Sequence, residues 1–230
     1  MENIIKYENS VFCMIDVGRY LRQKNLVSQD KLGDASVLIV GVGGLGSFSA
    51  IYLTMAGIGK IVLVDYDVVE ESNLNRQVLY REEDMGKKKV YIAAKRLKEI
   101  NPQVELIPLD GKIGEVEIPE VDIVVDGLDN LEARFTTENF ALKRGIPYVF
   151  GAVEGYMGMV TFIDEDTKKL EDFLPRIEKA LPQVLVSTVG MIAAIQSAEV
   201  IKYLNSKGDL LKNRLLIYDA LSTNFVEVKL

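Results

Sequence analysis

The stretch Ser36-Val-Leu-Ile-Val-Gly-Val-Gly-Gly-Leu-Gly46 decides the fold: an unbroken apolar run leads directly into closely spaced glycines. Such a run is typical of a strand that is buried on both faces of a parallel sheet. The glycines at Gly41, Gly43, Gly44 and Gly46 open a helix of small residues that we expect to reach about Ala56. Glycine lets a backbone approach a phosphate, and the helix N-terminus supplies N–H donors. The stretch therefore predicts a nucleotide-binding strand–turn–helix unit.

A carboxylate follows the next predicted strand. The apolar run 61–64 ends at Asp65, where a carboxylate can accept hydrogen bonds from ribose hydroxyls. The glycine pattern alone is a weak signal, but together with Asp65 it favours nucleotide binding over a simple tight turn. These two features do not distinguish NAD from ATP.

Strands and helices alternate along the rest of the chain. We expect strands at 104–109, 121–125, 148–150, 159–163, 215–218 and 225–228, and helices at 86–100, 130–144 and 187–204. Alternation of this kind predicts an α/β fold: a Rossmann-like, mostly parallel twisted sheet with helices on both faces and a C-terminal β extension.

Residues 1–230 are expected to form a single domain with two special segments. Residues 1–35 are interpreted as an N-terminal helical arm, with a helix from Asp16 to Asn25. Residues 164–186 are charged and irregular, and are interpreted as a mobile crossover segment that faces the substrate. Glu154, Tyr156 and Met157 follow a strand end and could line the acceptor pocket, but for each residue taken singly an ordinary core or surface role is the stronger interpretation.

Composition excludes several classes of function. The net charge of −7 leaves no excess of Lys and Arg to neutralise nucleic-acid phosphates or an anionic membrane. The absence of histidine removes Ser-His-Asp triads and His-liganded metal sites. A single cysteine, Cys13, permits neither an internal disulfide nor a Cys₄ zinc site. Without a signal peptide or an apolar run of about 20 residues, we expect a cytoplasmic protein.

A cationic set follows the second strand. Asn73, Arg76 and Gln77 come after Asp65 and Asp67, and Lys89 opens the next helix. Two cations in such a set can hold the outer charges of a triphosphate and stabilise departing pyrophosphate, which favours ATP over NAD. The competing interpretation is that Arg76 and Lys89 are solvated surface charges. Lys89 follows two other lysines, and considered by itself it is better explained as a solvated surface charge.

Another acidic motif, Asp126-x-x-Asp129-Asn130, ends the strand predicted at 121–125. Ligands bind at the carboxyl ends of strands in open α/β sheets, so Asp129 is well placed to hold Mg²⁺ on phosphates. Asp129 or Asn130 would serve equally well as the N-cap of the following helix. The sequence leaves both interpretations open.

The order of these motifs resembles a known family. Arg19-Tyr-x-Arg22-Gln23 precedes the glycine stretch, and Val64-Asp-Tyr-Asp67, Ser72-Asn-Leu-x-Arg-Gln77 and Gly86-x-x-Lys89 follow it, before Ile100-Asn-Pro102 and the Asp126 motif. In this order and spacing, they resemble the ubiquitin-activating (E1-like) and molybdopterin- and thiamine-biosynthesis adenylyltransferases. The resemblance is dense over residues 15–160 and weaker beyond.

The resemblance implies roles for particular residues. The glycine loop and Asp65 would hold adenosine and the α-phosphate, while Asn73, Arg76 and Lys89 would contact phosphates and Asp129 would organise Mg²⁺. Arg22 would reach the active site of a second subunit, which implies a homodimer. The full set of nucleotide contacts expected is Gly41, Gly43, Gly44, Gly46, Asp65, Asp67, Asn73, Arg76, Gln77, Lys89, Asp126, Asp129 and Asn130, with Arg22, Arg76, Lys89 and Asp129 catalytic.

The chain also departs from that family. It has no cysteine in 164–186, where members that activate ubiquitin-like proteins carry a nucleophile, and it lacks the paired cysteines that bind zinc in many members. Cys13 lies among apolar neighbours, which suits an inert buried thiol. We therefore expect an ATP·Mg²⁺-dependent enzyme without zinc that forms an acyl-adenylate and no cysteine thioester.

The substrate is open at this stage. The missing cysteines favour a small carboxylate in cofactor biosynthesis, as in the carboxyl-adenylating enzyme of the iron–guanylylpyridinol cofactor. The alternative is the C-terminal Gly-Gly of a ubiquitin-like or sulfur-carrier protein, with a separate thiol protein receiving the acyl group. Two other classes, an NAD-dependent oxidoreductase and a non-catalytic E1-like scaffold, would leave Arg76, Lys89 and Asp129 without a role.

Overall fold

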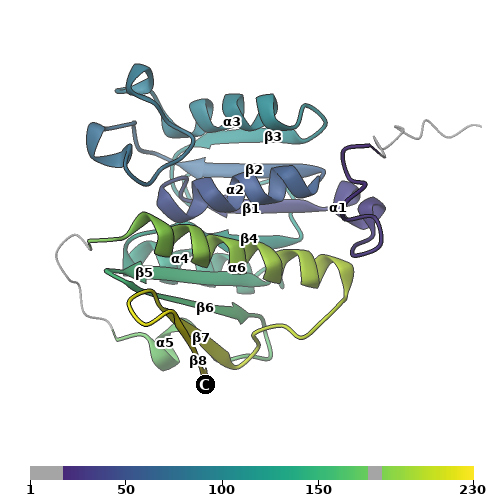
Figure 1. The fold of residues 1–230 in the computed structure, drawn as a ribbon, viewed down its shortest axis with the longest axis vertical. Coiled ribbons are helices and arrows are strands. Elements are labelled where there is room, and N and C mark those ends of the chain that lie inside the picture. Colours follow the sequence, from purple (N-terminus) through teal and green to yellow (C-terminus); the bar gives the residue numbers. More distant parts are fainter. Residues whose placement is uncertain (1–17, 176–182) are drawn as a thin grey trace, which may run out of the picture.

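A computed structural model describes residues 18–175 and 183–230 of the chain. Their strands form one eight-stranded sheet (Figure 1). In chain order the strands are β1 (Ser36–Val40), β2 (Lys60–Asp65), β3 (Glu105–Asp110), β4 (Ile123–Asp126), β5 (Tyr148–Glu154), β6 (Met157–Ile163), β7 (Arg214–Asp219) and β8 (Asn224–Lys229). The spatial order is β3-β2-β1-β4-β5-β6-β7-β8.

The sheet has a parallel half and an antiparallel half. Strands β3, β2, β1, β4 and β5 pair in parallel, while β6, β7 and β8 continue the sheet in antiparallel pairs. This arrangement confirms the predicted fold class, including the C-terminal β extension. Parallel strands end at the same edge, so the loops after β1, β2 and β4 are brought together at their carboxyl ends.

Helices cover both faces of the sheet. They are α1 (Gln29–Asp34), α2 (Gly44–Ala56), α3 (Lys89–Ile100), α4 (Leu131–Leu142), α5 (Leu170–Phe173) and α6 (Val186–Asn205). Buried residues of α2, α3 and α6 share one core cluster with Val37 and Ile39, while Ala141 of α4 and Leu170 of α5 share the other with Leu38 and Val40. Alternate β1 side chains therefore enter opposite cores, which explains the unbroken apolar run.

The helix predicted at 16–25 is wrong for its described part, since residues 18–26 form turns. Asn101 Nδ2 donates to the buried Tyr20 hydroxyl at 2.7 Å, and Gln23 Nε2 donates to the Ala56 carbonyl at 2.8 Å. These polar side chains tie the segment to the body of the protein, so tertiary contacts rather than helical periodicity set its conformation. Asp16 and Cys13 lie outside the described residues.

Smaller differences occur elsewhere. Helix α3 begins at Lys89 rather than at Gly86, whose φ of +77° is not helical. Strand β5 runs on to Glu154, because its pairing with β6 continues through Glu154↔Met157. Within 164–186, α5 is ordered into a short helix and Val184 bridges to Gly155. Residues 176–182 of the predicted mobile segment lie outside the described residues. No described helix is long and apolar enough to span a membrane.

Candidate active site

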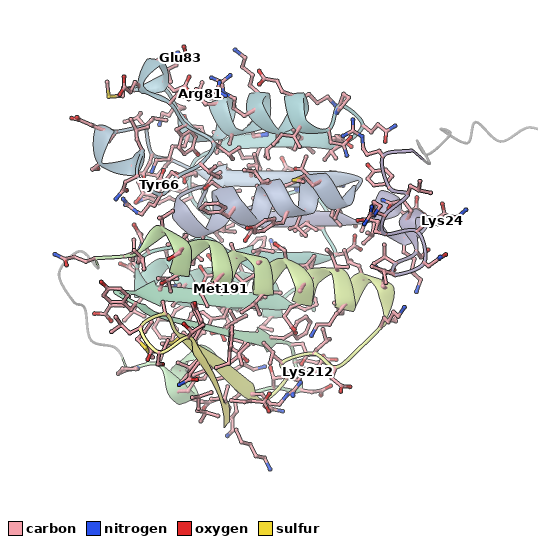
Figure 2. All side chains as sticks on the ribbon, viewed as in Figure 1. Lys24, Tyr66, Arg81, Glu83, Met191 and Lys212 are labelled. Atoms are coloured by element: carbon pink, nitrogen blue, oxygen red, sulfur yellow. The ribbon has the colours of Figure 1, made fainter. Side chains whose placement is uncertain are left out.

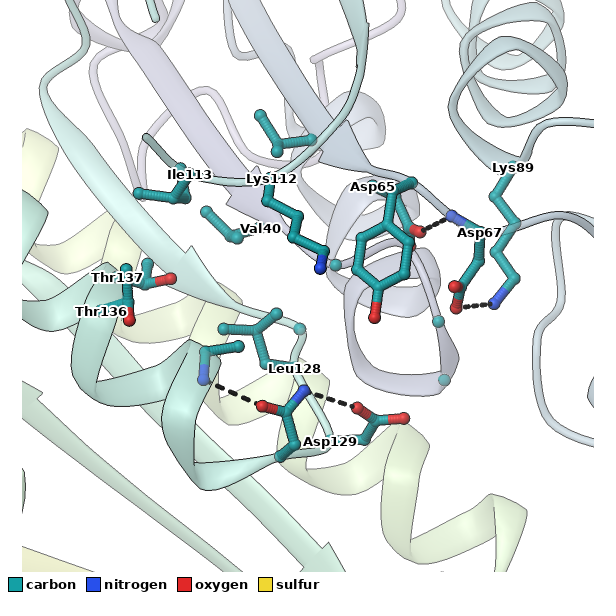
Figure 3. A pocket seen from close by; sticks show the side chains of 18 of the residues that line it. Val40, Asp65, Asp67, Lys89, Lys112, Ile113, Leu128, Asp129, Thr136 and Thr137 are labelled. Atoms are coloured by element: carbon teal, nitrogen blue, oxygen red, sulfur yellow. Dashed lines mark hydrogen bonds and ion pairs between the residues drawn. The ribbon is translucent and has the colours of Figure 1, made fainter. Parts of the chain in front are cut away.

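A cavity of about 500 Å³ opens at the carboxyl ends of β1, β2 and β4 (Figure 3). The side chains and backbone that line it all come from residues between Val40 and Thr137. Among the predicted site residues, those on the cavity wall are Gly41, Gly43, Gly44, Asp65, Asp67, Arg76, Gln77, Lys89, Asp129 and Asn130. The structure thus brings together the glycine loop, the acidic strand ends and the cationic set.

The packing of the loop after β1 leaves no room for a side chain at Gly41 or Gly46. Gly41 has a φ of +83°, and a Cβ placed on it would lie 2.6 Å from the Gly127 carbonyl oxygen. A Cβ on Gly46 would lie 1.9 Å from the Gly41 carbonyl oxygen, and one on Gly127 would lie 2.1 Å from the same atom. Gly46 and Gly127 therefore serve the close packing of the β1 and β4 loops. Gly46 does not line the cavity, contrary to the expectation of a nucleotide contact.

Asp65 lies on the cavity wall, and it also supports the loop. One of its carboxylate oxygens accepts a hydrogen bond from Val42 N at 2.7 Å, and the other accepts from Asp67 N at 2.8 Å. Burial raises the pKa of Asp65, which these two N–H donors and Lys89 oppose. Each oxygen keeps a further lone pair, so the carboxylate can also accept from ribose hydroxyls.

The cations reach the cavity from two elements. Lys89 is 5% exposed and its Nζ lies 3.0 Å from Asp67 Oδ2, whereas Lys87 and Lys88 hydrogen bond elsewhere on the surface. The solvated interpretation of Lys89 is therefore wrong. Arg76 Nη1 donates to the Ser72 carbonyl at 2.7 Å. In Figure 3, Lys89 and Asp67 lie side by side at one end of the site, joined by their ion pair.

Gln77 and Asn73 differ in their relation to the cavity. Gln77 is buried on the cavity wall, and its Oε1 has no hydrogen-bond partner among the described residues. Asn73 is also buried, but its Oδ1 accepts from Glu70 N at 3.1 Å within a short 3₁₀ helix at Glu71–Asn73. Asn73 does not line the cavity, so its position does not support the expected phosphate contact.

At the end of β4, one residue caps the next helix and its neighbour faces the cavity. Asn130 is the N-cap of α4, and its Oδ1 accepts from Ala133 N at 2.9 Å. Asp129 is exposed on the cavity wall, where Asn130 Nδ2 contacts its Oδ1 at 3.3 Å. Because Asn130 satisfies the helix N-terminus, the Asp129 carboxylate is available to a ligand.

The donor set fits a magnesium ion carried by a nucleotide. Mg²⁺ in nucleotide sites takes one or two carboxylates together with phosphate oxygens and water. Asp129 supplies one such carboxylate, and the described residues contain no group of three or more acidic, histidine or cysteine side chains that could hold a metal alone. Asp129 would hold the ion, and the phosphates would complete its coordination.

Asp126 is buried beside the loop after β4, which it supports, and it does not line the cavity. Its side chain is fully buried, Arg134 Nε lies 3.2 Å from one carboxylate oxygen, and Leu128 N donates to the other at 2.8 Å. Burial raises the pKa of Asp126, and the Arg134 charge opposes that change. Arg134 Nη2 also donates to the Leu128 carbonyl at 2.6 Å, so this pair fixes the loop that carries Asp129. Asp126 therefore does not line the cavity, contrary to the expectation of a nucleotide contact.

Arg22 lies far from the cavity of its own subunit. It is exposed in the turn segment before α1, beside Lys24, and Figure 2 shows Lys24 and the cavity residue Tyr66 at opposite ends of the sheet. Within one chain, the structure does not join Arg22 to the other predicted site residues.

Several wall residues were not identified from the sequence. Lys112 extends from the loop after β3 and its Nζ lies 4.7 Å from the centre of the Tyr66 ring. Thr136 and Thr137 of α4 lie near Ile113 and Val40 on the opposite wall in Figure 3. Lys112 follows a strand end and that position could have indicated it. Thr136 and Thr137 lie within a helix, and no sequence signal marks them.

Comparisons with known proteins identify the family of the chain. The profile of the ThiF family matches residues 18–230. A "Probable molybdopterin-synthase adenylyltransferase" of Porphyra purpurea is 35% identical over 91% of this chain, which spans only 58% of that protein. A "Sulfur carrier protein adenylyltransferase" of Thermus thermophilus is 34% identical, over 91% of this chain and 86% of the relative.

A solved structure shares the fold. The crystal structure of E. coli MccB with ATP superposes with a TM-score of 0.81 at 24% identity, over 94% of this chain and 72% of MccB. At that identity the likeness concerns the fold. The family profile covers every described residue, and the chain belongs to the ThiF family.

Proposed function

We propose that this protein adenylates a substrate carboxylate with ATP·Mg²⁺, releasing pyrophosphate. As a member of the ThiF family with relatives named for the same reaction, the chain is an adenylyltransferase. The observation that carries the proposal is the single cavity that gathers the glycine loop, Asp65, Arg76, Lys89 and Asp129. A dehydrogenase would have no use for Asp129 and two cations beyond its dinucleotide-binding loop.

Different wall residues contact different parts of the nucleotide in this proposal. The backbone of Gly41, Gly43 and Gly44 approaches the phosphates at the N-terminus of α2, and Asp65 accepts from ribose hydroxyls. Arg76 and Lys89 stabilise the negative charge of the outer phosphates. Magnesium held by Asp129 would neutralise phosphate charge as pyrophosphate departs.

The reaction needs alignment and charge stabilisation more than a protein nucleophile. A carboxylate oxygen of the substrate attacks the α-phosphorus, and the bond from that phosphorus to the oxygen bridging to the β-phosphate breaks. The electron pair leaves with pyrophosphate, and the acyl-adenylate remains. No protein group must accept or donate a proton in this step, which agrees with a sequence that contains no histidine.

A second subunit would complete the site. Arg22 is exposed at the end of the sheet opposite to the cavity, so it can serve catalysis only in another copy of the chain. We place Arg22 of one protomer near the outer phosphates of its partner, which makes a homodimer the active form. Arg22→Ala should then lower turnover, and mixing it with an Asp129→Ala protein should restore one working site per mixed dimer.

A small carboxylate is the first candidate substrate. The only cysteine of the sequence is Cys13, so no thioester can form in 164–186. An enzyme that releases its acyl-adenylate to an amine or sulfur donor suits a small acid in cofactor biosynthesis.

The C-terminus of a carrier protein is the second candidate, and two observations favour it. The Thermus relative is named for a sulfur carrier protein. In addition, exposed apolar side chains occur on the antiparallel half, including Tyr156, Met157, Phe225 and Val226. Exposed apolar groups of this kind suit a protein partner better than a small acid. Forming the adenylate itself needs no cysteine.

Pyrophosphate exchange distinguishes the candidates. Purified protein is incubated with ATP, Mg²⁺ and labelled pyrophosphate, together with a panel of small acids or a ubiquitin-like protein ending in Gly-Gly. Exchange that depends on a small acid supports the first candidate, and exchange only with the Gly-Gly protein supports the second. Tight NADH binding without ATP binding would contradict adenylation altogether.

A further inference from the structure

The buried Tyr80 packs against the glycine loop and does not line the cavity. Its hydroxyl donates to the Val42 carbonyl at 2.7 Å, and its side chain is 5% exposed. Tyr80 follows the phosphate-facing residues Arg76 and Gln77 in the long connection between β2 and α3, and its own N–H donates to the Gln77 carbonyl at 3.2 Å. It therefore joins two segments of the site that are far apart in sequence.

The peptide groups on both sides of Val42 are held from opposite directions. Asp65 Oδ2 accepts from Val42 N at 2.7 Å, while Tyr80 donates to Val42 O at 2.7 Å. The peptide that follows carries the N–H of Gly43, the N-cap residue of α2. Fixing both groups sets the direction in which the backbone N–H groups of this loop point.

The connection also packs directly on the loop. Gln77 Nε2 would lie 3.6 Å from a Cβ on Gly43, and Arg76 Cγ would lie 3.7 Å from a Cβ on Gly44. The loop must hold an unusual conformation, since Gly41 has a φ of +83° and Gly43 has a ψ of −140°. Glycines lose more conformational freedom than other residues on ordering, so such a loop needs contacts that hold it.

We propose that Tyr80 is a positioning residue for phosphate binding: its hydroxyl holds the Val42 carbonyl so that the glycine loop presents its N–H groups to ATP. This inference rests on the proposed function. Tyr80 acts through the loop and touches neither nucleotide nor substrate. It also couples the placement of Arg76 and Gln77 to that of the loop, because all three belong to one connection.

The hydroxyl remains a donor over the working pH range. Burial, together with the nearby charges of Asp65 and Asp67, holds the pKa of Tyr80 well above its ordinary value. A phenol that stays protonated keeps its hydrogen bond to the Val42 carbonyl. The geometry therefore does not depend on the ionisation of Tyr80.

The test compares ligands with and without phosphates. Binding of ATP·Mg²⁺ and of adenosine is measured by calorimetry for the wild type and for Tyr80→Phe, which removes the hydroxyl alone. We expect ATP·Mg²⁺ to bind about fivefold more weakly to the variant, the size of one hydrogen bond, and adenosine to bind within about twofold of the wild type. Tyr203→Phe, near the end of α6, is the matched control and should bind both ligands as the wild type does.

Each outcome is decisive. Unchanged ATP·Mg²⁺ binding by Tyr80→Phe, or an equal loss for adenosine, would overturn the positioning role. If the wild type itself does not bind ATP·Mg²⁺, the proposed function fails as well. Should Tyr80→Phe not fold, 3-fluorotyrosine at position 80 supplies a stronger donor of nearly the same shape. The inference then expects tighter ATP·Mg²⁺ binding, and equal or weaker binding would overturn it.

Discussion

The loops of the parallel half and the last strand of the antiparallel half differ in how closely they are packed. In the parallel half, glycines of the β1 and β4 loops interlock, and buried polar groups such as Asp65, Asp126 and Arg134 are tied by specific hydrogen bonds. In the antiparallel half, β8 is exposed along its whole length, with Phe225, Val226 and other apolar side chains at the surface. The interlocked loops of the first half leave little room for substitution, whereas the exposed strand β8 of the second leaves much.

The cavity belongs to the parallel half alone. Every residue on the cavity wall lies between Val40 and Thr137, so the shape of the nucleotide site is set before β5 begins. We expect substitutions on the exposed surface of β8 to leave that site undisturbed. The family profile matches both halves, residues 18–230, whereas all residues of the cavity wall belong to the first.

Removing the carboxylate of Asp129 should have the largest effect. Asp129→Ala leaves the fold intact, because the Asn130 cap and the Arg134 contacts remain, but it removes the proposed magnesium ligand. We expect pyrophosphate exchange to fall by about a hundredfold or more. Asp209→Ala, an exposed aspartate distant from the cavity wall, is the control, and near-normal exchange by Asp129→Ala would sink the assignment.

The second largest effect is expected where the glycines of the β1 and β4 loops pack against each other. Gly46→Ala or Gly127→Ala forces a methyl group against the Gly41 carbonyl, which should destabilise the fold by about 2–3 kcal/mol and weaken ATP binding. Gly33→Ala in α1 meets nothing within 4 Å and should be neutral or slightly stabilising. Thermal unfolding of the three variants measures this contrast, and equal melting temperatures would show that the interlock does not matter.

The exposed strand should tolerate change. Val226 is 54% exposed, so Val226→Ser is expected to alter stability by no more than about 0.5 kcal/mol and to leave ATP·Mg²⁺ binding unchanged. If a carrier protein docks on this half, the same variant should raise the KM for that protein. A loss of ATP affinity would contradict the division of labour between the halves.

A small pH effect should come from Glu138, which joins the two halves. Its carboxylate accepts from Leu170 N at 2.7 Å, and burial raises its pKa against the opposing effects of that bond and of Lys169, with Glu171 and Asp172 adding to the rise. An acid whose folded-state pKa is raised stabilises the fold at low pH, and that stability is lost as pH rises through the folded-state pKa.

Glu138→Gln keeps an acceptor for Leu170 and removes the ionisation. We expect it to be more stable than the wild type at neutral pH, with the difference shrinking as pH falls towards the ordinary pKa of a glutamate. Denaturant unfolding at a series of pH values measures this. A difference that does not change with pH would show that burial of Glu138 does not control its ionisation.

The sequence predicted the parallel half well because its signals are local. The apolar run before Gly41, Asp65 at a strand end and Asp129 after β4 each follow from spacing, and topology then brings them together. Asp126 and Asn73 do not line the cavity, because an ion pair with Arg134 and backbone capping at Glu70 turn their side chains away from it. The turn segment before α1 was also missed, since Tyr20 and Gln23 bond to residues far along the chain.

The most direct test of the account is pyrophosphate exchange by the wild type beside Asp129→Ala. The account predicts exchange that needs ATP, Mg²⁺ and a carboxylate substrate, either a small acid or a Gly-Gly protein, and that Asp129→Ala abolishes. Near-normal exchange by Asp129→Ala, or a wild type that binds NADH and never ATP, would contradict it.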